Sequence, residues 1–200
     1  MNGLTLEQKA CNYETMRHIE RVRNLLNLFV GDLLRRAEEH DQSKLESPEV
    51  EMFTEFTPKL AESTFGSEEY EGFRKAMGPA LAHHYANNAH HPEHFPPIKN
   101  ADIDTLVEDI SILEQSESLP PKTTARLLAR LRQDKATMES TINNMSLLDI
   151  VEMLIDWKAA SERHNNGNIL TSIEKNTNRF GISGQLARIM ENTTKMFETR

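Results

Sequence analysis

The sequence predicts an all-α fold in a single domain of residues 1–200. Apolar residues recur at intervals of three and four along most of the chain, and no stretch of alternating polarity bounded by turn residues stands out. A composition of 38% hydrophobic residues with 8 Gly and 8 Pro is ordinary for a globular protein. Disorder and fibrous repeats therefore fit poorly, and the chain is long enough to bury a sizeable core.

The first helix is expected from Leu6 to Glu39. Its apolar residues fall on one stripe of the helix surface, which also contains a histidine. The stripe consists of His18, Val22, Leu25, Phe29 and Leu33.

The second helix is expected to open at Ser47-Pro48-Glu49. Serine is a good N-cap, proline suits the first helical position, and glutamate favours the positive end of a helix. A third helix is expected to start near Ser67-Glu68-Glu69 and to be interrupted at Gly78-Pro79. Because Pro79 can serve as a first helical residue, it predicts a further helix that continues to about His90.

An ordered loop is predicted for residues 91–97, where three prolines disfavour a helix. Residues 101–144 combine helical patterns with polar linkers, which predicts an inserted helical hairpin. The most apolar helix follows at Leu147 to Trp157, and we expect it to be buried on most sides. Two last helices are expected at about Ile169 to Arg179 and Gly184 to Phe197.

The composition excludes several classes of function. A net charge of −8 disfavours a protein that binds nucleic acid duplexes, because such binding needs a clustered basic surface. No run of about 18 apolar residues and no signal-peptide core are present, so we expect a cytoplasmic protein without a membrane segment. Cys11 is the single cysteine, so a metal site would have to use histidines and carboxylates.

The strongest signal of chemistry is a cluster of histidines, since five of the eight lie between residues 83 and 94. On a helix, His84, Asn88 and His91 would share one stripe, and His83 and His90 would lie on a neighbouring one. The spacing leaves open which stripe faces a cavity. A solvent-exposed cluster with no ligand is the alternative.

Three further positions carry candidate ligands. His40 and Asp41 are adjacent at the end of the first helix, where an imidazole and a carboxylate can bind one metal or share two. Asp156 lies within an apolar run and needs a cationic partner, which could be a metal, Lys158 or Arg163. Asp149 follows Ser146 by three residues, the arrangement of a capping box, and is given a structural role.

The order of these residues resembles the ligand set of the HD-domain superfamily of all-α metal-dependent enzymes. The segments His40–Lys44, His83–Glu93 and Glu152–Trp157 look like the motifs of an uncharacterised HD-like family of bacteria and phages. The resemblance implies an HD-like helical bundle with residues 101–144 as an insertion. It also implies a set of metal ligands, with His90 as the substitute for His91: His18, His40, Asp41, His84, His91 and Asp156.

Such a site suits one or two divalent transition-metal ions, namely Mn, Fe, Co, Ni or Zn. The expected function is hydrolysis of a nucleotide or another small phosphate ester, with Asp41 and Lys44 as catalytic residues. Lys44, Asn88 and Arg163 are expected to bind the substrate. A di-iron oxygenase of HD type and a non-catalytic nucleotide-binding or interaction protein are the alternatives, and a homodimer is compatible with the sequence.

Overall fold

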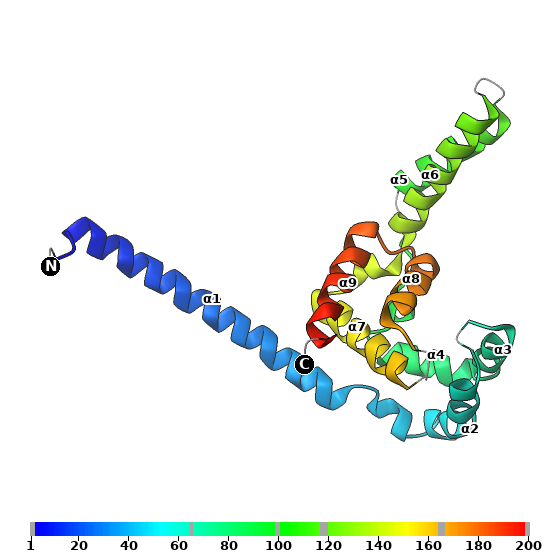
Figure 1. Cartoon of the computed structure of the whole chain (residues 1–200), viewed down its shortest axis with the longest axis horizontal. Helices are drawn as coiled ribbons and strands as arrows, with labels where there is room; N and C mark the ends of the chain where they lie inside the picture. The colour runs from blue at the N-terminus through cyan, green and yellow to red at the C-terminus, as the bar shows by residue number, and fades with distance from the viewer. Residues whose placement is uncertain (1–2, 65, 99–100, 117–119, 164–166, 199–200) are drawn as a thin grey trace. The chain divides into compact units, whose positions relative to one another are not determined.

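The computed structural model describes residues 3–64, 66–98, 101–116, 120–163 and 167–198 (Figure 1). Every regular element in these ranges is helical, which confirms the predicted all-α class. The chain divides into two compact units, Met1–His40 and Asp41–Arg200, which are described separately. No helix in the described ranges is both long and apolar enough to cross a membrane.

The first unit is one helix, α1 (Leu6–Glu39), with the bounds that the sequence predicts. A capping box begins it: the Gln8 amide donates to Thr5 Oγ1 at 3.2 Å, and the Thr5 amide donates to Gln8 Oε1 at 2.9 Å. A single helix has no second element in its own unit to cover its apolar stripe, and none of its residues is buried.

The second unit starts with a 3₁₀ turn, η1 (Gln42–Leu45), followed by α2 (Glu49–Glu62). The prediction that Ser47 caps this helix is wrong, because Pro48 holds the N-cap position. The carbonyl of Glu46 accepts hydrogen bonds from the amides of Glu49 and Val50, at 3.0 and 2.9 Å. These amides belong to the first turn, so the chain itself satisfies donors that a capping side chain would otherwise serve.

Two short helices follow, α3 (Glu68–Ala76) and α4 (Gly78–Asn87). The start of α3 is confirmed, and Ser67 caps it, since its hydroxyl accepts from the amide of Tyr70 at 3.1 Å. The predicted extension of α4 to about His90 is wrong. The helix ends at Asn87, and side-chain amides satisfy two carbonyls of its last turn. Asn87 donates to the carbonyl of His83, and Asn88 to that of His84, both at 2.8 Å. After α4 the chain turns into a short 3₁₀ segment, η2 (Pro92–His94).

The predicted hairpin is present as α5 (Ala101–Gln115) and α6 (Pro121–Glu139), which pack against each other. A further 3₁₀ turn, η3 (Thr141–Asn144), joins the hairpin to the last three helices. These are α7 (Leu147–Glu162), α8 (Ile169–Phe180) and α9 (Gly184–Glu198).

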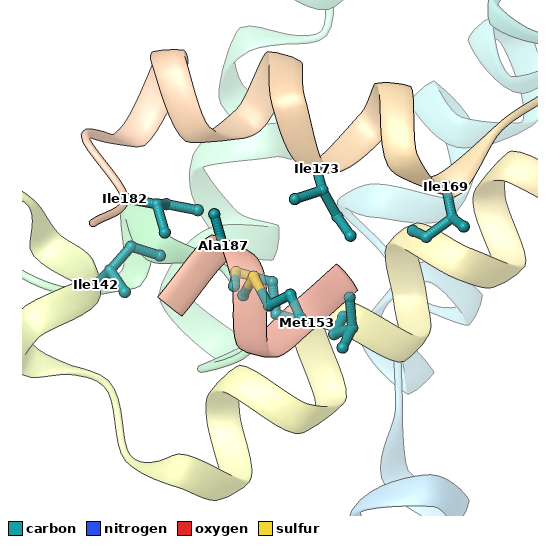
Figure 2. Close-up of a cluster of buried hydrophobic side chains, with 8 residues drawn as sticks. Ile142, Met153, Ile169, Ile173, Ile182 and Ala187 are labelled. Carbon is teal, nitrogen blue, oxygen red and sulfur yellow. The ribbon is translucent and has the colours of Figure 1, made fainter. Parts of the chain in front are cut away.

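The core of the second unit lies among α7, α8 and α9, where Figure 2 shows isoleucine and methionine side chains gathered between the helices. The predicted capping box of α7 is present, with the Asp149 amide 3.2 Å from Ser146 Oγ. The expectation that this helix is buried on most sides is confirmed, because only Leu147 and Ile155 are exposed between residues 147 and 157, at 63% and 41%. Met153 and Leu154 are its most deeply buried apolar residues and pack into the core.

Gly181 ends α8 in the left-handed conformation, with φ 64°. A Cβ at this position would lie 2.3 Å from the backbone oxygen of Ala136 in α6. Gly181→Ala is therefore expected to lower the free energy of unfolding by about 2–4 kcal/mol, through backbone strain and the clash together. Chemical denaturation measures the change.

Gly72→Ala is the matched control, because an added Cβ at this position of α3 meets nothing within 4 Å. This variant should raise the free energy of unfolding by about 0.5–1 kcal/mol. Equal stability of the Gly181 variant and the wild type would contradict the close packing of α6 on α8.

Candidate metal centre

Asp41 opens the second unit in a left-handed backbone conformation, with φ 57° and ψ 13°. Aspartate is one of the few residues besides glycine that tolerate this region, because its short side chain bonds locally. The turn that follows brings Lys44 against it, with 2.5 Å between Lys44 Nζ and Asp41 Oδ2. The other carboxylate oxygen, Oδ1, faces two histidine rings.

Three imidazoles gather around the Asp41 carboxylate. His84 Nε2 lies 3.3 Å from Asp41 Oδ1, and His90 Nε2 lies 3.5 Å from the same atom. The Nε2 atoms of His84 and His91 are 2.9 Å apart. One ligand atom from each of these four residues lies within 4.8 Å of the others. The side chains of His84 and His90 are only 1% and 2% exposed, so the donor atoms converge in a buried place.

Two glutamates contact the Nδ1 atoms of these rings, on the side away from Asp41. Glu49, at the start of α2 and fully buried, has its Oε2 2.9 Å from His84 Nδ1. Glu152 of α7 has its Oε1 3.0 Å from His90 Nδ1. A carboxylate only accepts hydrogen bonds, so each neutral ring carries its proton on Nδ1 and keeps a lone pair on Nε2. A carboxylate behind a metal-binding histidine is the usual device for orienting such a ligand.

The donor set fits a divalent metal ion. Two imidazole lone pairs each lie within 3.5 Å of one carboxylate oxygen and repel it, and a cation among these atoms removes the repulsion. Imidazole and carboxylate together favour Mn, Fe, Co, Ni or Zn over Ca and Mg.

Burial keeps the imidazoles of His84 and His91 neutral. It lowers the pKa of His84, with the charge of Lys44 acting in the same direction and Asp41 and Glu49 opposing it. Burial, together with the neighbouring His90 and His84 rings, lowers the pKa of His91 to about 2. Both rings therefore hold the neutral form at pH 7, in which an imidazole can bind a metal.

Asp156 lies half-buried on α7, and one of its carboxylate oxygens is within 4.8 Å of one from Asp41. Two carboxylates this close also favour a cation beside them. Of the other partners considered for Asp156, Lys158 is bonded to Glu162 and Arg163 is exposed at the end of α7. The structure therefore brings together four of the predicted ligands: Asp41, His84, His91 and Asp156.

The remaining predicted ligands lie in the first unit, which is described by itself. His18 is a residue of α1, and His40 is its C-cap, directly before Asp41 in the chain. Ligation by either residue stays a prediction from the sequence.

The structure also separates the alternatives within the histidine cluster. His84 points inward, whereas His83 is 42% exposed and contacts the outer oxygen of Glu49 at 2.7 Å. His90 joins the cluster together with His91. His94 contacts the carbonyl of Tyr85 at 2.8 Å and lies outside the cluster, and His164 lies outside the described residues.

Two predicted substrate contacts have other surroundings. The Asn88 amide donates to Ser43 Oγ at 2.9 Å and to the His84 carbonyl, so it braces the His84 backbone, and it is not among the described residues that line the neighbouring cavity. Arg163 is not among the described residues that line the neighbouring cavity. Lys44, by contrast, lines that cavity, and its ammonium lies 4.9 Å from the centre of the Phe53 ring.

Neither Glu49 nor Glu152 is among the site residues predicted from the sequence. A usable signal existed for Glu152, because it precedes Asp156 by four residues and so shares a face of α7 with it. Glu49 has no such signal, since its role depends on the approach of α4 to α2.

A cavity of about 580 Å³ opens beside the centre, within the second unit. Its lining includes Lys44, His84, His91 and Asp156 on the side of the candidate ligands. A cavity of this size accommodates a small organic ligand.

Comparison with known proteins places the chain in a family. A model described as a family of unknown function, DUF5662, matches residues 7–198. No curated protein and no solved structure matches the chain.

Proposed function

We propose that this chain, which belongs to the DUF5662 family, is a metal-dependent phosphohydrolase that acts on a nucleotide or another small phosphate ester. One observation carries the proposal. The buried Glu49 and the half-buried Glu152 fix the Nε2 lone pairs of His84 and His90 toward the same oxygen of Asp41, beside a cavity. The resemblance to HD-domain enzymes, stated from the sequence, supports the reaction class.

Asp41, His84, His91 and Asp156 would hold one or two divalent ions, with His90 beside them. His40 and His18 complete the set that the resemblance implies. A divalent ion bound there supplies Lewis-acid chemistry toward water and phosphate oxygens at neutral pH.

Lys44 is the residue best placed to bind the phosphate. It lines the cavity, and its salt bridge to Asp41 holds its ammonium beside the candidate ligands. A cation in this position neutralises charge on the phosphate oxygens, and a half-buried site strengthens the interaction. Asp41 shares its two oxygens between Lys44 and the histidines, so it links phosphate binding to metal binding.

The test is phosphate release by the metal-loaded protein from a panel of nucleoside phosphates and a generic aryl phosphate. We expect release that a chelator stops and that Mn or Co restores. Lys44→Ala should reduce turnover about tenfold or more while the bound metal stays constant. Lys59→Ala is the matched control, because that exposed lysine of α2 pairs with Glu55.

No release from any member of the panel at full metal occupancy would overturn the proposed hydrolase. If such a protein also copurified with iron and absorbed visible light, the di-iron oxygenase would replace it. Bound nucleotide without turnover would instead indicate the binding protein.

A further inference from the structure

Two arginines from distant parts of the sequence line the cavity near His91. Arg74 comes from α3 and Arg179 from α8. Neither belongs to the candidate metal centre. Arginine is the side chain best suited to bind phosphate and carboxylate groups, because its planar fork offers five donors.

Arg74 is held in place by a neutral partner. Its Nη2 donates to the Tyr85 hydroxyl at 3.2 Å, and the Tyr85 ring lies 5.0 Å from the ring of His91. Its charged partner is Glu71, one turn earlier on α3 and 54% exposed, and such surface pairs contribute little. The side chain of Arg74 is itself only 20% exposed. Its positive charge is therefore held in the cavity lining, at the Tyr85 hydroxyl, without being strongly neutralised.

Arg179 reaches the same region from α8. Its Nη2 lies 2.6 Å from Oε1 of Glu93, two residues after His91. Burial raises the pKa of Tyr70, and the charges of both arginines oppose this rise, so both act on one phenol of the cavity lining. The two guanidinium groups thus border one part of the cavity.

We propose that Arg74, assisted by Arg179, binds a second anionic group of the substrate. The substrate is then a phosphate ester that carries a further phosphate or carboxylate, because the ester phosphate itself lies toward Lys44 and the metal ligands. This inference rests on the proposed function for the identity of the first group. Among the described lining residues, the lysines and arginines (Lys44, Arg74, Lys175, Arg179) outnumber the carboxylates (Glu62, Glu93, Asp156), which favours an anionic ligand.

The experiment measures binding of non-hydrolysable probes to the metal-loaded protein by calorimetry. The probes are alkane diphosphonates of increasing chain length, each compared with the alkylphosphonate of the same length. At the best length, the wild type should bind the diphosphonate about tenfold or more tightly than its single-anion partner, the contribution of a charge-assisted hydrogen bond. Carboxyalkyl phosphonates tell whether the second group is a phosphate or a carboxylate.

Arg74→Gln should bring this ratio to within about twofold of unity and leave the affinity for the alkylphosphonate unchanged. Arg74→Lys should restore part of the preference, since it keeps the charge and loses the fork. Arg130→Gln is the control, because this arginine of α6 is 77% exposed and pairs with Asp134. Metal content and thermal unfolding of each variant show whether it is folded and loaded.

A wild type that binds both probes alike at every length would overturn the subsite. Equal weakening of both probes by Arg74→Gln would also overturn it, because the residue would then act on the fold or on the first group. The readout does not need turnover, so the two proposals fail separately. If the protein prefers diphosphonates but hydrolyses no ester, only the proposed hydrolase activity is rejected. If it hydrolyses esters without this preference, only the proposed second anion subsite is rejected.

Discussion

Replacing Asp41 by alanine should remove the bound metal almost completely. Its Oδ1 lies 3.3 Å from His84 Nε2 and 3.5 Å from His90 Nε2, so the change deletes the anionic donor that the two rings share. Loss of an outer carboxylate commonly costs 10- to 100-fold in metal affinity, and loss of a direct ligand should cost more than about a hundredfold. Elemental analysis of protein purified after loading with Mn or Zn measures the result.

The left-handed backbone at Asp41 has to be separated from its charge. Asp41→Asn serves this purpose, because asparagine tolerates the same conformation and removes only the charge. It too should lose most of the metal. Asp134→Ala, at an exposed carboxylate of α6 that pairs with Arg130, should keep full occupancy. Full metal content in the Asp41→Ala protein would show that the ligand assignment is wrong.

Replacing Glu152 by glutamine should weaken metal binding without abolishing it. The Glu152 carboxylate accepts the Nδ1 proton of His90 at 3.0 Å and so keeps the lone pair of this ring on Nε2. A glutamine fills the same space without the negative charge, and the affinity for metal should fall about 10- to 100-fold. Titration of the metal-free protein with Zn, followed by calorimetry, measures this change.

Glu162→Gln is the matched control for Glu152, because it lies on the same helix, is 63% exposed and pairs with Lys158. Its metal affinity should equal that of the wild type. Glu49→Gln should resemble the Glu152 variant, because Glu49 holds His84 in the same way. An affinity within twofold of the wild type for both variants would show that the two glutamates do not orient the ligands.

His84 and His91 lie close together, as the sequence predicts, although the predicted length of the helix that carries His84 is wrong. Their separation by seven residues predicts a shared face if α4 continues past His90. The helix stops at Asn87, yet the turn that follows still brings the two Nε2 atoms to 2.9 Å. A segment this short allows few backbone paths, so His84 and His91 lie close together although the helix has ended between them. The position of His90 relative to them could not be predicted from the helical spacing.

The sequence by itself determined the local features of this protein. The bounds of α1, the caps at Ser67 and Ser146, the helical hairpin and the clustering of histidines all depend on residues within a turn or two of each other. Periodicity and capping chemistry act over that range, so they can be predicted from the order of residues.

Only the tertiary structure decided which of these histidines face one another and what surrounds them. Glu49 meets His84 from 35 positions away, and Arg179 meets Glu93 from 86. Such contacts depend on how α2, α4, α7 and α8 pack. A carboxylate in this packing orients a histidine because it accepts a hydrogen bond from a ring on another element. The order of residues holds no local trace of such a pair, and for this reason the role of Glu49 and the arginines of the cavity emerged only from the folded chain.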